Sequence, residues 1–273
     1  MKLVLLCGDE PLQRGLAQRL SRIAPLAAIV KVRPRSRPAT LRSRLGRLAR
    51  GLTGLPLRRA WKATQAHFDQ LAPEFPEAPM LAVESVNAPD VAALIAEIRP
   101  DFVLVSGTDL LRRPLIEAIE RGGGQILNLH TGISPYVKGG PNCTNWCLAT
   151  GRFDLIGNTI LWIDPGIDSG DIVATERTPL SGRETLAELH IAVIDHGHDL
   201  YGRALARLVS GAPLPRVAQA EIGSGRTFMT KEWTAAAAAR AVANFHLHHR
   251  RAALTALEPL TLIALEGADS SSR

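Results

Sequence analysis

Short apolar runs typical of buried β-strands alternate along this chain with segments of helical periodicity. The strand-like runs are residues 3–7, 27–32, 81–86, 102–106, 125–129 and 156–163. Between the first two, Leu12, Leu16 and Leu20 recur every four residues, as on one face of a helix. This alternation predicts an α/β fold: a Rossmann-like, doubly wound, mostly parallel sheet with helices on both faces.

The C-terminal third is expected to be mainly helical. An apolar pattern over residues 185–209 predicts one long helix, and an Ala-rich segment predicts another over 234–249. Residues 225–230 are expected to form a short strand or extended arm. With 273 residues in all, we expect one domain over 1–210, followed by a helical C-terminal extension over 211–273.

The positive charge of the chain is concentrated in one segment. Residues 31–62 hold 11 of the 32 Lys and Arg residues and no Asp or Glu, whereas the whole chain has a net charge of +6. Leucines recur there at spacings of three and four residues, so we predict a basic, partly helical insertion over 31–75. It is either an insertion with a solvated Arg face or a docking surface for an anionic partner at 31–62: a phosphorylated substrate, RNA or a membrane surface.

Composition and targeting signals predict a soluble, cytoplasmic protein. The apolar run at 3–7 is too short for a signal peptide, and no stretch of eighteen apolar residues free of charge occurs. Three cysteines do not suggest a disulfide framework. Cys143 and Cys147 lie four residues apart without a second ligand pair, so no metal site is expected.

Two segments carry the residue types of an acyl-transfer site. Asn128 and His130 stand two apart at a strand end, so both side chains lie on the same face. Asp168 follows a later strand in a Pro–Gly turn. Ligands of open α/β sheets bind at the carboxyl ends of the strands. An amide and an imidazolium there can stabilise an oxyanion, while a carboxylate orients the imidazole and helps to receive a proton.

These segments resemble the folate-dependent formyltransferases. The resemblance rests on residues 128–130 (NLH), 135–139 (PYVKG) and 164–172 (DPGIDSGDI). It implies that 1–210 is a formyltransferase catalytic domain, with 10-formyltetrahydrofolate as formyl donor, an amine as acceptor and no metal.

The resemblance also implies roles for individual residues. Asn128, His130 and Asp168 would be the catalytic trio. Two loops would bind the pteridine largely through backbone groups, and their residues are Leu110, Leu111, Arg112, Asp164, Pro165, Gly166 and Ile167.

The sequence constrains the identity of the formyl acceptor less than that of the donor. Asp9 and Glu10 in the first loop would repel the phosphate of glycinamide ribonucleotide. The basic insertion resembles that of methionyl-tRNA formyltransferases, but the 64 residues after Val209 lack the strand runs of their C-terminal barrel. Residues 140–146 and 225–233 resemble enzymes that formylate nucleotide-linked amino sugars, which makes such a sugar the leading acceptor. A homodimer is plausible by the same resemblance.

Two further functions stay open at this point. A formyltetrahydrofolate hydrolase would use the same trio with water in place of the amine, although residues 1–80 leave no room for its usual N-terminal regulatory domain. A non-catalytic protein docking on RNA or membrane is disfavoured because all three catalytic residue types are present.

Overall fold

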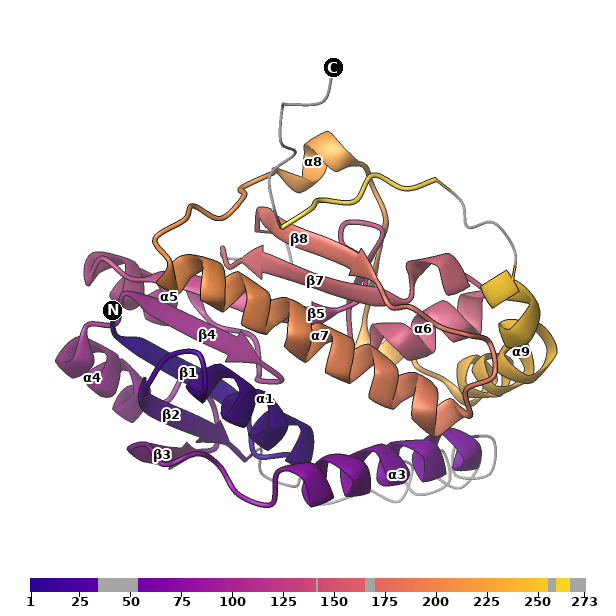
Figure 1. Cartoon of the computed structure of the whole chain (residues 1–273), viewed down its shortest axis with the longest axis horizontal. Coiled ribbons are helices and arrows are strands. Elements are labelled where there is room, and N and C mark those ends of the chain that lie inside the picture. The colour runs from indigo at the N-terminus through magenta and orange to yellow at the C-terminus, as the bar shows by residue number, and fades with distance from the viewer. Residues whose placement is uncertain (34–53, 141, 165–169, 255–258, 266–273) are drawn as a thin grey trace.

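The computed structural model describes residues 1–33, 54–140, 142–164, 170–254 and 259–265. Its centre is a seven-stranded sheet in the order β3-β2-β1-β4-β5-β7-β8 (Figure 1). The strands are β1 (Leu3–Gly8), β2 (Leu26–Val32), β3 (Met80–Val83), β4 (Phe102–Ser106), β5 (Gln125–Thr131), β7 (Gly157–Trp162) and β8 (Ile172–Arg177). The first five run parallel, and β7 and β8 are antiparallel to their neighbours. The expected mostly parallel sheet is confirmed.

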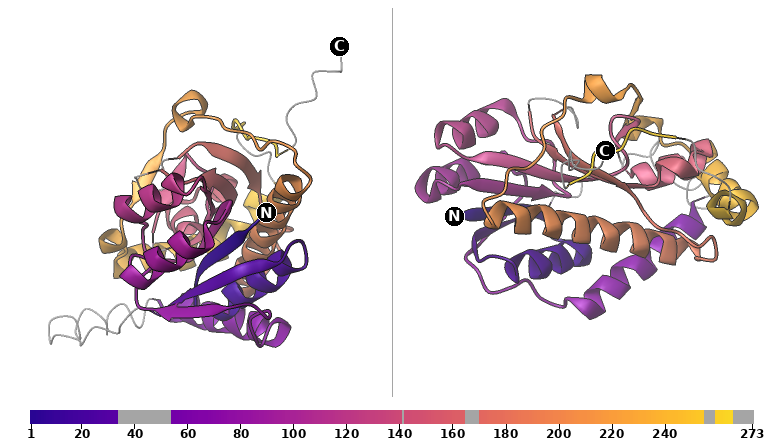
Figure 2. Two further views of the ribbon diagram at one scale, coloured as in Figure 1. Left: turned by 90° about the vertical axis from the view of Figure 1, so that its left-hand side faces the viewer. Right: turned by 45° about the horizontal axis from the view of Figure 1, so that its top comes forward.

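Helices cover both faces of the sheet, because alternate residues of the central strands point to opposite sides. Leu3, Leu5 and Cys7 pack on the side of α1 (Pro11–Ser21) and α7 (Leu186–Val209). Val4 and Leu6 pack on the side of α4 (Pro89–Ile98) and α5 (Arg113–Arg121). Figure 2 shows the two helical layers with the sheet between them. The doubly wound arrangement predicted from the sequence is therefore confirmed.

The expected strand over 81–86 ends early, at Val83. The carboxylate of Asp109 accepts hydrogen bonds from the backbone N–H of Val86 (2.9 Å) and the Ser85 hydroxyl. These bonds hold residues 85 and 86 in a turn, so the apolar pattern overestimated the strand.

One helix lies inside the range of the predicted insertion. α3 (Leu55–Leu71) packs against α1 and α7, on the same face of the sheet (Figure 1). Residues 34–53, which hold much of the basic segment, lie outside the described residues.

A second core lies beyond the end of β5. There α6 (Cys143–Thr150) packs against α9 (Ala235–Leu254), and β6 (Val137–Gly139) pairs in parallel with β9 (Arg226–Phe228). The remaining short elements are η1 (Phe153–Leu155), α8 (Gln219–Ile222) and η2 (Thr230–Glu232). Elements of 226–254 thus complete a core whose other half comes from the middle of the chain. Among the described helices, none is long and apolar enough to cross a membrane.

Candidate active site

A cavity of about 820 Å³ opens at the carboxyl ends of β4 and β5. Asn128 and His130 both line it, as the two-residue spacing predicted. Asn128 stands on β5 between Val105 of β4 and Leu161 of β7. Beside it, the buried hydroxyl of Tyr201 donates to the carbonyl oxygen of Leu127 (2.7 Å) and accepts from the Val105 N–H (3.0 Å). A side chain of α7 therefore fixes both strands next to Asn128.

The imidazole of His130 is closely confined by the backbone. His130 is 8% exposed, and its Nε2 lies 3.3 Å from the carbonyl oxygen of Val137. Gly132, at a φ of +147°, passes so near that a Cβ there would lie 2.9 Å from Nε2. A glycine is needed at this position because both its backbone angle and the adjacent ring exclude a side chain. The ring is thus held rigidly in the cavity wall.

The predicted acidic turn flanks the same cavity. Asp164 lines it on one side of the turn and Gly170 on the other. Gly170 is held by Gln219, whose Nε2 donates to its carbonyl oxygen (2.8 Å), and a Cβ there would collide with the Trp162 carbonyl. Asp168, with Pro165, Gly166 and Ile167, lies outside the described residues. Both ends of their segment therefore reach the cavity that contains Asn128.

The second predicted folate-binding segment is the loop after β4. Leu110 and Leu111 line the cavity, whereas Arg112 is not among its lining residues. Asn87 holds this loop: its Nδ2 donates to the Leu110 carbonyl oxygen (3.0 Å), and its Oδ1 accepts from the Arg112 N–H (2.7 Å). Sequence reasoning missed Asn87, since it lies far from the loop in the chain and belongs to no motif.

Residues 140–146 and 225–233, the segments whose sequences resemble amino-sugar formyltransferases, meet at another side of the cavity. Trp146 stacks on Phe228 with ring centroids 4.3 Å apart, and Trp233 meets Trp146 edge-on. The Gly140 N–H donates to the Phe228 carbonyl oxygen (3.0 Å). Gly140, Asn145 and Phe228 are among the lining residues of this wall.

The cavity also extends between three helices on one face of the sheet. We call this part the α1–α3–α7 lobe, and its lining residues are Leu12, Gln13, Leu57, Trp61, His190 and Ile194. His198 lines the cavity two helical turns beyond His190. Burial lowers the pKa of His190 to about 4 and, together with Arg19, that of His198 to about 3. Both rings are therefore neutral at neutral pH.

The sequence assigned no functional role to these histidines. One sequence pattern could have indicated them. Residues 190, 193, 194 and 198 are apolar or histidine and are spaced three or four apart, so one face of α7 lies toward the cavity. That spacing is equally typical of an ordinary core helix, so it did not point to a site.

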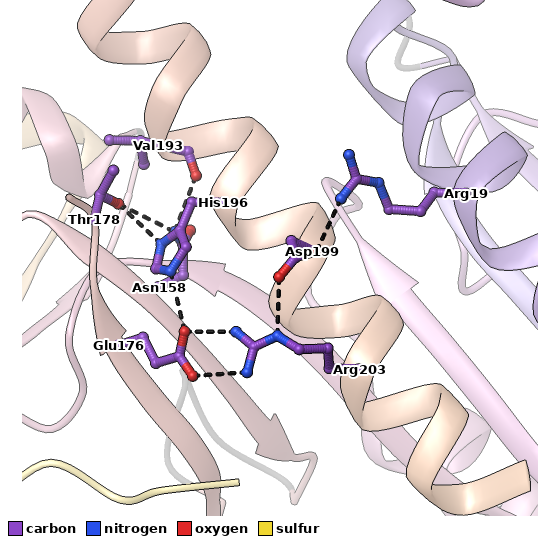
Figure 3. Close-up of polar contacts among 8 residues, drawn as sticks. All are labelled: Arg19, Asn158, Glu176, Thr178, Val193, His196, Asp199 and Arg203. Atoms are coloured by element: carbon purple, nitrogen blue, oxygen red, sulfur yellow. Dashed lines mark hydrogen bonds and ion pairs between the residues drawn. The ribbon is translucent and has the colours of Figure 1, made fainter. Parts of the chain in front are cut away.

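A polar network fixes α7 to the sheet (Figure 3). Asn158 of β7 donates through Nδ2 to the Val193 carbonyl oxygen (2.9 Å). His196 lies 3.0 Å from a carboxylate oxygen of Glu176 on β8, and Arg203 donates to both oxygens of that carboxylate. Although burial opposes it, hydrogen bonds from Arg203 and His196 lower the pKa of Glu176. The network holds in place the helix that carries His190.

Among the described residues, no group of three or more His, Cys, Asp or Glu side chains is arranged to hold a metal ion. Cys143 and Cys147 are both buried on α6.

The sequence was compared with models of known protein families. A family model described as formyl transferase matches residues 57–205, more than half of the chain. The chain belongs to the formyl transferase family. The match begins within the range predicted as an insertion and contains Asn128, His130 and the whole acidic turn.

The relatives that match by sequence include methionyl-tRNA formyltransferases. Methionyl-tRNA formyltransferase of Geobacter metallireducens is 31% identical over 134 residues, covering 49% of this chain and 42% of the relative. The chain thus spans less than half the length of this curated relative.

Solved structures show the same fold. A sugar N-formyltransferase from Shewanella superposes with a TM-score of 0.55 and 16% identity, over 85% of this chain and 78% of that one. An N-formyltransferase from Helicobacter canadensis, in complex with folinic acid and dTDP-3-aminofucose, superposes with a TM-score of 0.53 and 13% identity, over 90% and 81%.

Proposed function

We propose that this protein is an N-formyltransferase that moves a formyl group from 10-formyltetrahydrofolate to a primary amine. The observation that carries the proposal is the placement of Asn128 and His130 in one cavity, flanked by Asp164 and Gly170 at the two ends of the acidic turn. Family membership supports the same reaction class.

The cavity suits a folate donor on its own chemistry. Leu111 and Ile163 offer an apolar wall, and the loop of residues 107–111 brings backbone groups to the same place. A flat heterocycle with several hydrogen-bonding edges matches such a wall. When bound, the donor supplies an activated formyl carbon. Leu110, Leu111 and Asp164 are the described residues proposed to hold it.

The roles of the side chains follow from the developing charge. As the amine nitrogen bonds to the formyl carbon, the formyl oxygen gains negative charge, which the Asn128 amide and a protonated His130 stabilise by hydrogen bonds. Asp168, through a water molecule, is proposed to receive the proton that the amine loses. When the tetrahedral species collapses, the bond between the formyl carbon and the donor nitrogen breaks, and that nitrogen takes up the proton that the amine lost. Tetrahydrofolate and the formamide are released, so no covalent enzyme intermediate is required.

The proposed acceptor is an amine on a nucleotide-linked sugar. Support comes from the aromatic cluster of Trp146, Phe228 and Trp233, in which the two segments that resemble amino-sugar formyltransferases pack together and of which Phe228 lines the cavity. The Helicobacter canadensis neighbour, which bound a dTDP-linked amino sugar, is consistent with this choice. A homodimer stays a prediction.

The test is tetrahydrofolate release from 10-formyltetrahydrofolate, with and without nucleotide-linked amino sugars and other primary amines. Acceleration by one amine, with a formylated product detected by mass spectrometry, is the expected result. Release that no amine accelerates would instead identify a hydrolase. No release from folded protein with any acceptor, including methionyl-tRNA, would contradict the proposal.

Methionyl-tRNA is the second candidate acceptor, favoured by the Geobacter metallireducens relative and by the basic segment at 31–62. If that segment binds RNA, affinity for tRNA will fall steeply with salt, because each phosphate contact releases a counterion. Salt titration of tRNA binding checks this. Undetectable or salt-insensitive binding would exclude an RNA-docking role.

A further inference from the structure

The α1–α3–α7 lobe contains a buried polar atom without a partner. Gln13 is 3% exposed, and its Oε1 makes no hydrogen bond among the described residues. An unpaired buried carbonyl oxygen is unfavourable, because it has lost its hydrogen bonds to water and gained none in return. Gln13 lines the cavity, so a ligand that enters the lobe can supply the missing donor.

The placement of Gln13 is specified by its surroundings. Its amide lies against Gly107, where a Cβ would collide with Nε2. Gly107 has a φ of +65° and directly follows β4, the strand that pairs with β5 beside Asn128. Gln13 is therefore held one strand away from the proposed reacting groups.

The rest of the lobe is apolar and aromatic. Trp61 and His190 meet edge-to-face, with centroids 5.9 Å apart and an interplanar angle of 88°. Leu12 and Ile194 pack together in one cluster, against which Trp61 lies. Neutral aromatic edges and aliphatic groups favour a flat, uncharged ligand group.

Charge and spacing disfavour other occupants. The described residues that line the cavity include no Lys or Arg, whereas Glu10, Asp109 and Asp164 are acidic. Among the described lining residues, a phosphate in the lobe would therefore meet no cationic partner. His190 and His198 are eight residues apart on one helix, an axial separation of about 12 Å, so they cannot share a metal ion.

The topology places this lobe opposite the folate-binding loop. β1 and β4 are adjacent although they are not consecutive, which makes their carboxyl ends the switch point of the sheet. From this point α1 runs onto one face, while the loop of Leu110 and Leu111 leads into α5 on the other. Donor and acceptor can thus approach Asn128 from different sides.

We propose that the α1–α3–α7 lobe binds an uncharged planar ring of the acceptor molecule, with Trp61 and His190 as its walls and Gln13 Oε1 accepting a hydrogen bond from a ring N–H. The inference rests on the proposed function and names the acceptor's recognition group. The ring is either the base of a nucleotide-linked amine or the aromatic group of a small amine.

Direct binding to the full chain tests the assignment without folate. The probes are two matched pairs, thymidine with N3-methylthymidine and indole with N-methylindole, titrated by calorimetry or ligand-observed NMR. In one pair, the N–H form is expected to bind about tenfold more tightly than the N-methyl form. Preference for the N–H form within the thymidine pair identifies the ring as the base of a nucleotide-linked amine. Preference within the indole pair identifies it as the aromatic group of a small amine.

Two variants test the contribution of the hydrogen bond and that of the aromatic wall separately. Gln13→Met keeps the length of the side chain but removes the acceptor, so the two members of the pair should bind alike. Trp61→Ala should weaken both about tenfold. Gln18→Ala is the matched control, since Gln18 lies on the same helix and bonds to the Glu74 carbonyl oxygen instead.

Three outcomes would overturn the proposal: no probe binds, N–H preference persists in folded Gln13→Met, or Trp61→Ala binds like the wild type. Circular dichroism establishes that each variant is folded. Because formyl transfer is measured separately, ring binding without turnover would contradict the proposed function and leave the lobe assignment standing. Turnover without ring binding would contradict the lobe assignment and leave the proposed function standing.

Discussion

At the residue scale, the proposed chemistry depends on two side chains that one strand presents together. Asn128 and His130 share a face of β5, and the backbone around Gly132 and Val137 confines the imidazole. Confinement matters because an oxyanion is stabilised best by donors that need no reorganisation as charge develops. The same strand begins at Gln125, an exposed residue that does not line the cavity.

Asn128→Ala is expected to lower the rate of formyl transfer by about 10²- to 10³-fold, the usual cost of one oxyanion donor. The melting temperature should change little, since Asn128 lies at the cavity surface rather than in the core. Steady-state kinetics and thermal unfolding check both statements. Gln125→Ala on the same strand is the control, and equal turnover of the two variants would contradict the role of Asn128.

At the element scale, α7 links the sheet to the lobe. The helix contacts β7 and β8 through Asn158, His196 and Glu176 (Figure 3). His190 of the same helix lines the cavity. The contact with β7 is close: a Cβ on Gly197 would lie 2.6 Å from Asn158 Oδ1 and 3.3 Å from a methyl carbon of Leu129. The Asn158 side chain cannot move away from a Cβ at residue 197 without losing its hydrogen bond to the Val193 carbonyl oxygen.

Gly197→Ala is therefore expected to lower the free energy of unfolding by about 1–3 kcal/mol through overpacking. Gly202→Ala, five residues later on α7, is the matched control because its Cβ would meet only flexible side-chain atoms of Ile23 and Arg19, the nearest at 3.3 Å. Helix propensity should make that variant neutral or more stable by up to about 1 kcal/mol. Urea unfolding measures both, and equal destabilisation would contradict the packing argument.

At the scale of the whole molecule, the C-terminal helix α9 is joined to the body by polar as well as apolar contacts. The buried His249 lies 2.9 Å from a carboxylate oxygen of Glu184, in the segment before α7. Burial alone would raise the pKa of Glu184, but hydrogen bonds from Ser181 and His249 outweigh it and lower the pKa to about 2. The ionised carboxylate is therefore the form that stabilises this junction.

Glu184→Gln should lower the melting temperature at pH 7, and the difference from wild type should narrow as the pH falls. The folded-state pKa is below the ordinary value, so the stabilisation is complete above about pH 4.5 and is lost as the pH approaches 2. Thermal unfolding from pH 7 to 3 measures this. Glu97→Gln, at an exposed position of α4, is the control. A difference that does not depend on pH would show that ionisation of Glu184 is not the cause.

The sequence by itself determined the local elements and part of the site. Strand and helix periodicity is a property of neighbouring residues, so the strands predicted over 102–106 and 125–129 and the shared face of Asn128 and His130 followed from spacing. The second strand extends two residues further, to Thr131. Leu110, Leu111 and Asp164 line the cavity, and their folate-binding role stays a prediction.

Tertiary structure decided which distant segments meet. The contact of Gln13 with Gly107, the pairing of β6 with β9, and the lobe between Trp61 and His190 join residues far apart in the chain. No local period encodes such contacts, because they form when helices and strands pack to bury apolar surface. The motif at residues 164–172 indicated the acidic turn. The α1–α3–α7 lobe could not be predicted, because it forms only where these three helices pack together on one face of the sheet.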